Sequence, residues 1–149
     1  MVVIVLGLVA YATTRGGPDS SSGRGVTTRE VVVSHVVDGD TVEIRSGEHV
    51  RLIGIDTPER DACGYVRAAQ ALRRLVEGKE VELVDPDSVV DQDRYDRLLR
   101  YVDVGGRDAG YLQISSGLAR ARYDSRDGYD PHPRQKRYRA ADRAAPDVC

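Results

Sequence analysis

The sequence predicts an α+β fold in which a small five-stranded β-barrel carries three α-helices. The first observation is the order of its segments: three short strands, a helix, two further strands and then helices. The second is that turn residues separate these segments at short intervals. The third is that 149 residues, 40% hydrophobic and 31% charged, are typical of one soluble domain with its own core.

The first three strands are expected at residues 30–37, 41–45 and 49–55. The first of them (EVVVSHVV) is rich in β-branched residues, and the second (TVEIR) alternates in polarity. Residues 38–40 (DGD) and 46–48 (SGE) are turn formers between them. Because turns this short join neighbouring strands, the three should form an antiparallel meander.

The first helix is expected at residues 63–76, where apolar residues recur at i, i+4, i+7 and i+8 from Ala68 and Gly78 follows as a stop. Strands four and five are expected at 80–84 and 97–104, on either side of an acidic loop.

Two more helices are expected at residues 108–116, ended by Gly117, and 133–145. This order of elements is that of an OB-fold barrel, the oligonucleotide/oligosaccharide-binding type. Such barrels often hold nucleic acid on an open face, although a fold alone proves no activity.

The N-terminus has a different composition from the rest. Residues 2–12 are apolar but too few to span a bilayer, which takes about 20 residues. They suit the hydrophobic region of a signal peptide, a trimmed membrane anchor, or an ordinary buried strand. Residues 13–28 read as a flexible linker. We therefore expect a signal or anchor segment at 1–12, a linker at 13–28 and one domain at 29–149.

Net charge is −2, so the total does not indicate a nucleic-acid-binding protein, but residues 120–143 hold eight basic and four acidic side chains. That segment is either a solvated charged helix or a binding surface. The two cysteines, Cys63 and Cys149, lack zinc-ligand spacing. In an oxidising compartment a disulfide between them would pin the C-terminal tail, and the alternative is two free thiols.

Two acidic turns are candidates for chemistry. In a meander, the turn after the first strand and the end of the third can lie at one end of the sheet, which would gather Asp40, Asp56 and Glu59. Three close carboxylates repel one another unless a cation lies among them. Oxygen ligands without His or Cys favour calcium or magnesium over zinc.

Arg51 and Arg97 supply the opposite charge near these turns. A guanidinium donates two hydrogen bonds to phosphate oxygens and stays charged. A cation flanked by arginines suits a phosphodiester, on which charge develops during attack. Glu59 is then the spare carboxylate that accepts a proton from water. Arg51 and Asp56 are five residues apart, so a twist or bulge must bring both to one face.

The sequence resembles the staphylococcal nuclease (thermonuclease) family. The matching stretches follow the family's order and spacing from about residue 31 to 138: VVDGDTVEI (36–44), VRLIGIDTPE (50–59), EGKEVELV (77–84), DRYDRLLRYV (93–102) and GLARARY (117–123).

The resemblance implies a role for each matching residue. Asp40, Asp56 and the Thr57 carbonyl correspond to the ligands of one calcium ion, and Glu59 to the general base. Arg51 and Arg97 correspond to the arginines that bind the scissile phosphate and stabilise the five-coordinate transition state. The substrate-holding positions, which bind the neighbouring phosphate and stack on the base, are Tyr95, Tyr123 and Arg94.

The sequence departs from the family at several positions. Asp96 stands where the family usually has glycine, so its carboxylate either pairs with Arg97 or points to solvent. Ser125 replaces a common second tyrosine, which leaves base stacking to Tyr123 with help from Tyr129. The loop after Glu59 is short, and the frequent C-terminal tryptophan is absent.

These observations predict a monomeric, calcium-dependent nuclease that acts on DNA, RNA or both and is secreted or anchored to the cell envelope. The alternative is a catalytically weak OB-fold module that binds nucleic acid. All five residues of the expected chemistry are present, which favours the enzyme. No catalytic role is expected for the three histidines, His35, His49 and His132.

Overall fold

The structure is a computed structural model and describes residues 25–149. The expected signal or anchor segment (1–12) and most of the expected linker lie outside the described residues. The barrel strands are β1 (Thr27–Val36), β2 (Thr41–Ile44), β3 (His49–Leu52), β5 (Glu80–Asp85) and β6 (Leu98–Val104). The helices are α1 (Tyr65–Val76), α2 (Ala109–Ser115) and α3 (Gln135–Ala144). Three two-residue strands complete the fold: β4 (Ile55–Asp56), β7 (Arg107–Asp108) and β8 (Arg120–Ala121).

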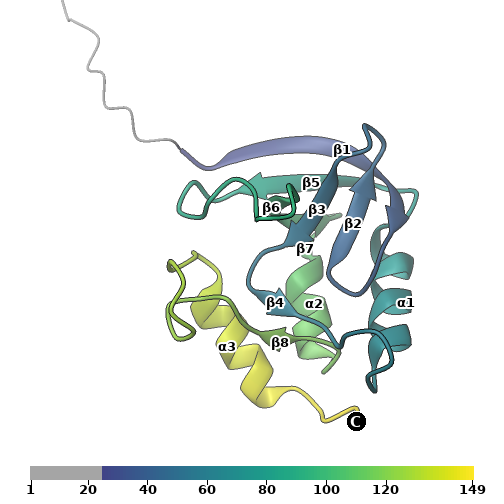
Figure 1. The fold of residues 1–149 in the computed structure, drawn as a ribbon, viewed down its shortest axis with the longest axis vertical. Helices are drawn as coiled ribbons and strands as arrows, with labels where there is room; N and C mark the ends of the chain where they lie inside the picture. The colour runs from purple at the N-terminus through teal and green to yellow at the C-terminus, as the bar shows by residue number, and fades with distance from the viewer. Residues whose placement is uncertain (1–24) are drawn as a thin grey trace, which may run out of the picture.

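The five main strands close on themselves. Their hydrogen-bonded order is β3-β2-β1-β5-β6, and β6 pairs back in parallel with β3 through Val50↔Leu98 and Leu52↔Arg100. A register shift in β1, between Val33 and His35, adds the local bend that a small closed barrel needs. The predicted five-stranded OB-type barrel with three helices is confirmed (Figure 1).

The core fills the barrel and extends to the helices, which lie below the barrel in Figure 1. The barrel strands contribute valines and leucines that are at most 2% exposed, such as Val33, Val42 and Leu83, and α1 adds the fully buried Leu72 and Val76. The chain has no Phe or Trp, so Tyr101 of β6 and Tyr138 of α3 supply the large buried rings. Tyr138 donates a hydrogen bond to Asp108 at 2.8 Å, which satisfies its hydroxyl in the core.

Several element boundaries differ from the sequence prediction. β1 begins at Thr27, inside the segment expected as a linker, because residues 27 and 28 pair with Asp85 and Val84 of β5. α1 begins at Tyr65 rather than residue 63, since Gly64 before it has a left-handed φ of 92°. Among residues 25–149, no helix is long and apolar enough to cross a membrane.

The third strand is shorter than expected and ends at Leu52 instead of Ile55. Gly54 has φ +76°, and a Cβ placed there would lie 2.5 Å from the His132 ring, so the chain turns away from the barrel at this point. It resumes as β4, which pairs with β8 through Ile55↔Ala121 and Asp56↔Arg120. This break places the acidic stretch after β4 below the barrel.

Candidate active site

The candidate site begins at the turn between β1 and β2. Asp40 precedes β2, and the β2–β3 register pairs Thr41 with Arg51, so the acid and the arginine are neighbours across two strands. Arg51 Nε lies 3.1 Å from Asp40 Oδ1. Gly39 fixes this turn, because its carbonyl accepts a hydrogen bond from Gln113 of α2 at 2.7 Å. A Cβ at Gly39 would lie 2.7 Å from Ala68 of α1, so a larger residue would displace the turn.

The break at Gly54 solves the geometric problem that five-residue spacing posed. On a flat strand Arg51 and Asp56 would face opposite sides, yet Arg51 Nη2 lies 3.7 Å from Asp56 Oδ1. Tyr123, three residues beyond Arg120 of β8, donates to the same oxygen of Asp56 at 3.0 Å. The guanidinium of Arg51 is also 5.6 Å from the centre of the Tyr123 ring. The structure therefore brings Asp40, Arg51, Asp56 and Tyr123 together.

Thr57 joins the same group through donors. Its backbone N–H and its hydroxyl both donate to Asp40 Oδ2, at 3.0 and 2.7 Å. Asp40 is only 6% exposed, and burial raises the pKa of its carboxyl above the ordinary value, while Arg51 and the Thr57 hydrogen bonds oppose that rise. The buried carboxylate is thus only partly compensated by the charge beside it.

Arg97 lies in a second group, just before β6. Asp93 Oδ2 pairs with its guanidinium at 2.7 Å, and Asp93 Oδ1 accepts from the backbone N–H groups of Tyr95 and Arg97. Burial alone would raise the pKa of Asp93, but the hydrogen bonds from Arg97 and the backbone lower it. Arg94 donates to the Tyr95 hydroxyl at 2.7 Å, and Arg97 lies 5.4 Å from the Tyr95 ring centre.

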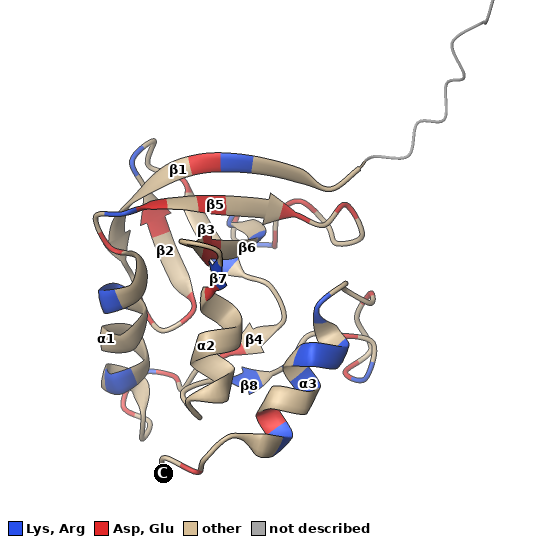
Figure 2. Ribbon diagram, turned by 180° about the vertical axis from the view of Figure 1, so that it is seen from behind, with Lys and Arg blue, Asp and Glu red and all other residues tan. Residues whose placement is uncertain are grey.

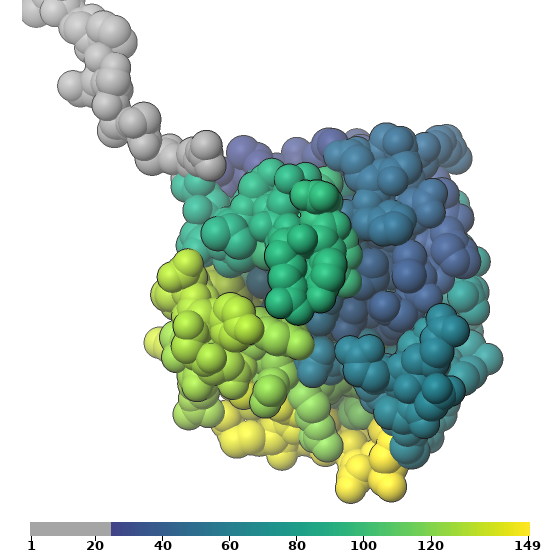
Figure 3. Space-filling view, viewed as in Figure 1, coloured from purple at the N-terminus to yellow at the C-terminus, as the bar shows by residue number. Residues whose placement is uncertain are grey.

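Thr41 connects the two groups. Its hydroxyl accepts from Arg97 Nη1 at 3.3 Å and donates to Asp40 Oδ1 at 3.2 Å. Both arginines line one pocket of about 460 Å³, together with Tyr95 and Tyr123. In Figure 3 the green segment of residues 89–97 lies next to the yellow-green segment of residues 123–130, and both line the pocket together with residues 51–53. The pocket is open to solvent and has the size of a nucleotide-binding site.

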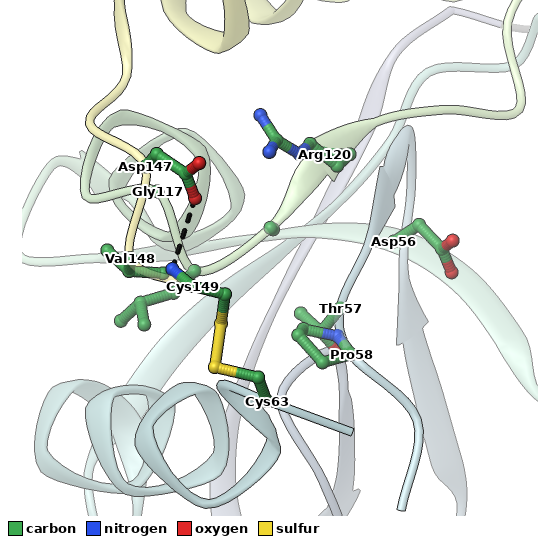
Figure 4. Close-up of a pocket in the computed structure, with 11 residues that line it drawn as sticks. Asp56, Thr57, Pro58, Cys63, Gly117, Arg120, Asp147, Val148 and Cys149 are labelled. Carbon is green, nitrogen blue, oxygen red and sulfur yellow. Dashed lines mark hydrogen bonds between the residues drawn. A yellow bond between two sulfur atoms is a disulfide. The ribbon is translucent and has the colours of Figure 1, made fainter.

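Glu59 is not drawn into this group. It is exposed, and its side chain makes no hydrogen bond or ion pair with any residue from 25 to 149. The loop that contains Glu59 runs on to Cys63, which forms a disulfide with Cys149 (Figure 4). The expected bridge is therefore present, and both cysteines line a cavity of about 230 Å³ together with Thr57 and Pro58.

Sequence reasoning missed Asp93 and Thr41 as parts of the site. The partner of Arg97 is Asp93, whereas Asp96, the adjacent residue, adopts φ +60° and makes no ion pair within the described chain. A signal was available, since an aspartate that starts a turn commonly caps the N–H groups after it. Tyr129 lies edge-on to Tyr123, with ring centroids 5.4 Å apart, and lines the same pocket.

The candidate metal donors are all oxygen atoms. Residues 25–149 hold no cluster of three or more His, Cys, Asp or Glu side chains suited to a metal ion. The donors available are the carboxylates of Asp40 and Asp56 and the main-chain carbonyl of Thr57. This set fits a hard divalent cation such as Ca²⁺, which accepts carboxylate and carbonyl oxygens and completes its shell with water. A cation would also offset the cost of burying Asp40.

The fold and the site define a class: an OB-type barrel in which the buried Asp40 and Arg51 lie with Asp56 and Arg97 at a nucleotide-sized pocket. Residues 49–146 match the family described as staphylococcal nuclease homologue. The chain is 31% identical over 133 residues to the thermonuclease of Staphylococcus intermedius, which covers 83% of this chain and 77% of that protein. The chain belongs to the staphylococcal nuclease homologue family.

Two further relatives extend the comparison. The thermonuclease of Staphylococcus hyicus is 28% identical over 136 residues, covering 83% of this chain and 79% of that protein. The SPbeta prophage-derived endonuclease YokF of Bacillus subtilis is 33% identical over 103 residues, covering 63% of this chain. The chain spans only 34% of the length of the Bacillus protein, so that protein holds sequence with no counterpart here.

Proposed function

We propose that this protein is a nuclease that uses one calcium ion to hydrolyse phosphodiester bonds of DNA, RNA or both. The observation that carries the proposal is the position of Arg51, which lies between the carboxylates of Asp40 and Asp56 at the wall of a nucleotide-sized pocket. Burying the Arg51 charge costs desolvation free energy, so a buried arginine at this place suggests a function such as phosphate binding. Family membership supports the same activity.

Arg51 and Arg97 bind the scissile phosphate and stabilise the charge that develops on its oxygens. Both guanidiniums line the pocket, and Thr41 connects Arg97 to the carboxylate that holds Arg51. Their orientation is fixed before substrate arrives, by Asp93 for Arg97 and by Asp40 for Arg51. Donors held in place in this way lower the barrier because they need no reorganisation during the reaction.

Asp40, Asp56 and the Thr57 carbonyl hold the calcium ion, which when bound adds positive charge next to the phosphate. Glu59 accepts a proton from the attacking water. Its carboxylate is exposed and unpaired within residues 25–149, so it is available to water, and Pro58 sets it just after the metal donors. Water adds to phosphorus opposite the leaving oxygen, and that oxygen departs with a proton from solvent.

Tyr95, Tyr123 and Arg94 hold the nucleotide next to the cleaved bond. Tyr95 is 62% exposed and lies under the Arg94 guanidinium, 4.8 Å from the ring centre, so this pair offers a hydroxyl and a cation to a neighbouring phosphate. Tyr123 and Tyr129 present exposed ring surface to the base. Tyr129 thereby substitutes for the tyrosine that Ser125 replaces.

The disulfide of the domain supports export to the cell envelope or the exterior. A stable disulfide is typical of oxidising compartments, and the Cys63–Cys149 bridge supports export on that ground. We also propose that residues 1–12 are the signal or anchor segment, 13–28 the tether and 29–149 a monomeric catalytic domain.

A second candidate function is nucleic-acid binding without efficient cleavage. It is favoured by two observations: Asp93 already pairs with Arg97, and the Glu59 side chain makes no orienting hydrogen bond or ion pair within residues 25–149. In this case the pocket would bind a nucleotide, but hydrolysis would be slow.

The test is hydrolysis of single-stranded DNA and RNA by the full chain with calcium, with magnesium and with chelator. We expect cleavage with calcium that the chelator abolishes. Glu59→Gln should lower kcat at least about 100-fold and leave substrate affinity largely unchanged, because a general base contributes about 10²–10⁴-fold. Glu80→Gln, an equally exposed glutamate of β5, is the matched control.

Binding without cleavage in any metal would favour the binding module. Unchanged turnover in Glu59→Gln would remove Glu59 as the base but leave the nuclease. A circular single-stranded DNA substrate separates the two cutting modes, since only an endonuclease opens it.

A further inference from the structure

The basic charges of residues 120–143 fall into two sets. One set is paired within the fold: Arg120 with Asp142, Arg134 with Asp103 and Asp108, Arg137 with Asp108, and Arg139 with Asp124 and Asp127. These arginines attach α3 and the loop before it to the rest of the domain. Their charge is largely neutralised by partners at hydrogen-bond distance.

The other set is unpaired. Arg122, Arg126, Lys136 and Arg143 are exposed, and their side chains make no ion pair or hydrogen bond with any described residue. Three of them, Arg126, Lys136 and Arg143, line a single pocket of about 340 Å³ between α3 and the loop that precedes it. We call this the α3 pocket, and Figure 2 shows basic residues along α3.

The walls of the α3 pocket are positively charged and are held in place by hydrogen bonds. Its one acid, Asp124, accepts two hydrogen bonds from Arg139, at 2.7 and 2.8 Å, so it does not cancel the unpaired cations. Ser125 donates its hydroxyl to Gln135 at 3.2 Å, which joins the loop to the start of α3. Gln135 lines the pocket, and its NH2 group makes no hydrogen bond with a described residue.

The α3 pocket is continuous with the proposed substrate site along the chain. Tyr123 lines the nucleotide-sized pocket, and Asp124 and Ser125, the next two residues, line the α3 pocket. Two residues span at most about 7 Å. Asp124 is held by Arg139, so the positions of the two pockets are fixed relative to each other. A polynucleotide that stacks a base on Tyr123 would therefore place its following phosphates near these cations.

We propose that the α3 pocket is a second phosphate-binding subsite, which holds the backbone of a single-stranded polynucleotide beyond the nucleotide at Tyr123. The proposal rests on the proposed function for its substrate class. Arg126, Lys136 and Arg143 each offer an exposed cation to a phosphate, and a positive groove beside an aromatic platform is typical of single-strand binding. Contacts of this kind give affinity that depends on chain length and salt but not on sequence.

The test measures binding of labelled oligothymidylates of 4 and 20 nucleotides to the full chain, with chelator present so that no hydrolysis competes. The variant is Arg126→Ala/Lys136→Ala/Arg143→Ala. Its matched control, Arg45→Ala/Arg74→Ala/Arg107→Ala, removes three exposed cations that do not line the α3 pocket and whose side chains make no hydrogen bond or ion pair with a described residue. Thermal melting confirms that both variants fold.

We expect the α3-pocket variant to bind the 20-mer about tenfold more weakly, at about twofold per exposed charge, with a smaller loss for the 4-mer. The slope of log affinity against log salt should become shallower by about 2, because three contacts to a single strand are lost. The control should bind like the wild type.

Equal affinity of the variant and the wild type for the 20-mer would overturn the proposal, as would an equal loss in the control variant or an equal loss for both lengths. Parallel hydrolysis assays separate this outcome from failure of the proposed function. A chain that cuts DNA but binds independently of the α3 pocket is a nuclease without the second subsite. A chain that binds through the α3 pocket but cuts nothing retains the subsite and lacks the nuclease activity.

Discussion

Arg51 and Arg139 each lie between two aspartates, but their contacts differ. Arg139 makes two parallel hydrogen bonds to Asp124, at 2.7 and 2.8 Å, and a third to Asp127 at 2.6 Å. Arg51 makes single contacts of 3.1 Å to Asp40 and 3.7 Å to Asp56. The first arrangement has the fork geometry of a strong ion pair, and the second does not.

The pKa directions follow the same division. The hydrogen bonds from Arg139 hold the pKa of Asp124 below its ordinary value, and Asp124 in turn raises the pKa of Arg139. At Asp40, burial outweighs Arg51 and raises the pKa of the carboxyl. The charges around Arg139 are therefore satisfied by one another and hold α3 to the loop before it. At the site, the charges of Asp40 and Arg51 are only partly compensated by each other. A cation beside Asp40 and a phosphate beside Arg51 would complete the compensation.

The largest expected effect comes from removing the two arginines separately. Arg51→Gln should lower kcat about 10²- to 10³-fold, the usual effect of losing a donor to transition-state charge. Arg139→Gln should instead lower the free energy of unfolding by about 3 kcal/mol, because it strands the buried Asp124. Its kcat, measured below the melting temperature, should stay within a fewfold of wild type.

Steady-state kinetics and urea unfolding on both variants check this contrast, with Arg74→Gln of α1 as a control expected to change neither quantity. A loss of activity in Arg139→Gln as large as that in Arg51→Gln would show that the two clusters do not have separate roles.

The next effect concerns the bond that holds the site loop. Ion pairs of Arg134 and Arg139 hold α3 in place, whereas the Cys63–Cys149 disulfide holds the loop after Glu59 and spans a sequence separation of 86 (Figure 4). Cys63→Ser/Cys149→Ser should lower the free energy of unfolding by about 3 kcal/mol, a typical value for a disulfide. For a domain of this size that is a shift of about 10 °C in Tm.

Melting curves with and without reductant provide the measurement. Reductant should shift the wild type and leave the double variant unchanged. Curves of the wild type that coincide under both conditions would mean that the bridge does not form in solution.

The effect of calcium on stability should differ between variants of Asp40, the partner of Arg51, and of Asp124, the partner of Arg139. At 100 times its Kd, calcium should raise the free energy of unfolding by about 2.7 kcal/mol through binding to the native state alone. Asp40→Asn should remove most of this increment because it removes a proposed ligand. Asp124→Asn should lower the starting stability but keep the increment.

Melting with and without calcium on the three proteins gives both numbers. The assignment of Asp40 as a ligand would be wrong if Asp40→Asn retained the full calcium increment.

The sequence was sufficient where the determinants were local. Alternation, β-branched runs and turn residues located the barrel strands within a few residues, because strand pairing across short turns is set by neighbours in sequence. The acidic turns and the nearby arginines singled out the charged site residues, and family resemblance added a role for each. The structure brings Asp40, Arg51 and Asp56 into one group.

The sequence was insufficient where a distant residue decides the outcome. The third strand breaks at Gly54 because His132, far along the chain, occupies the space beside it. The partner of Arg97 is Asp93 and not the adjacent Asp96, since the turn between them directs the side chains differently. No local pattern reveals β4 and β8, whose pairing depends on that break.

His132 also gives the smallest predicted effect, on the pH dependence of stability. The ring is buried behind Gly54, its Nδ1 lies 2.8 Å from the Tyr101 hydroxyl, and its Nε2 has no hydrogen-bond partner among the described residues. Burial lowers the pKa of His132 below its ordinary value of 6.5, against the opposing charge of Asp124. The folded protein thus holds this histidine neutral, whereas the unfolded chain protonates it near pH 6.5.

The unfolded state therefore binds the extra proton, and the stability that His132 contributes is present above about pH 6.5 and is lost as pH falls through its lower folded pKa. The slope of the unfolding free energy in this window should approach, but not exceed, about 1.4 kcal/mol per pH unit. His132→Gln should flatten it, while His49→Gln, an exposed histidine of β3, should preserve it. Urea unfolding from pH 7.5 to 5 measures the slope directly. A slope that survives in His132→Gln would mean that another group titrates in this range. The break at Gly54 would then depend on packing against the His132 ring and not on the neutral state of the imidazole.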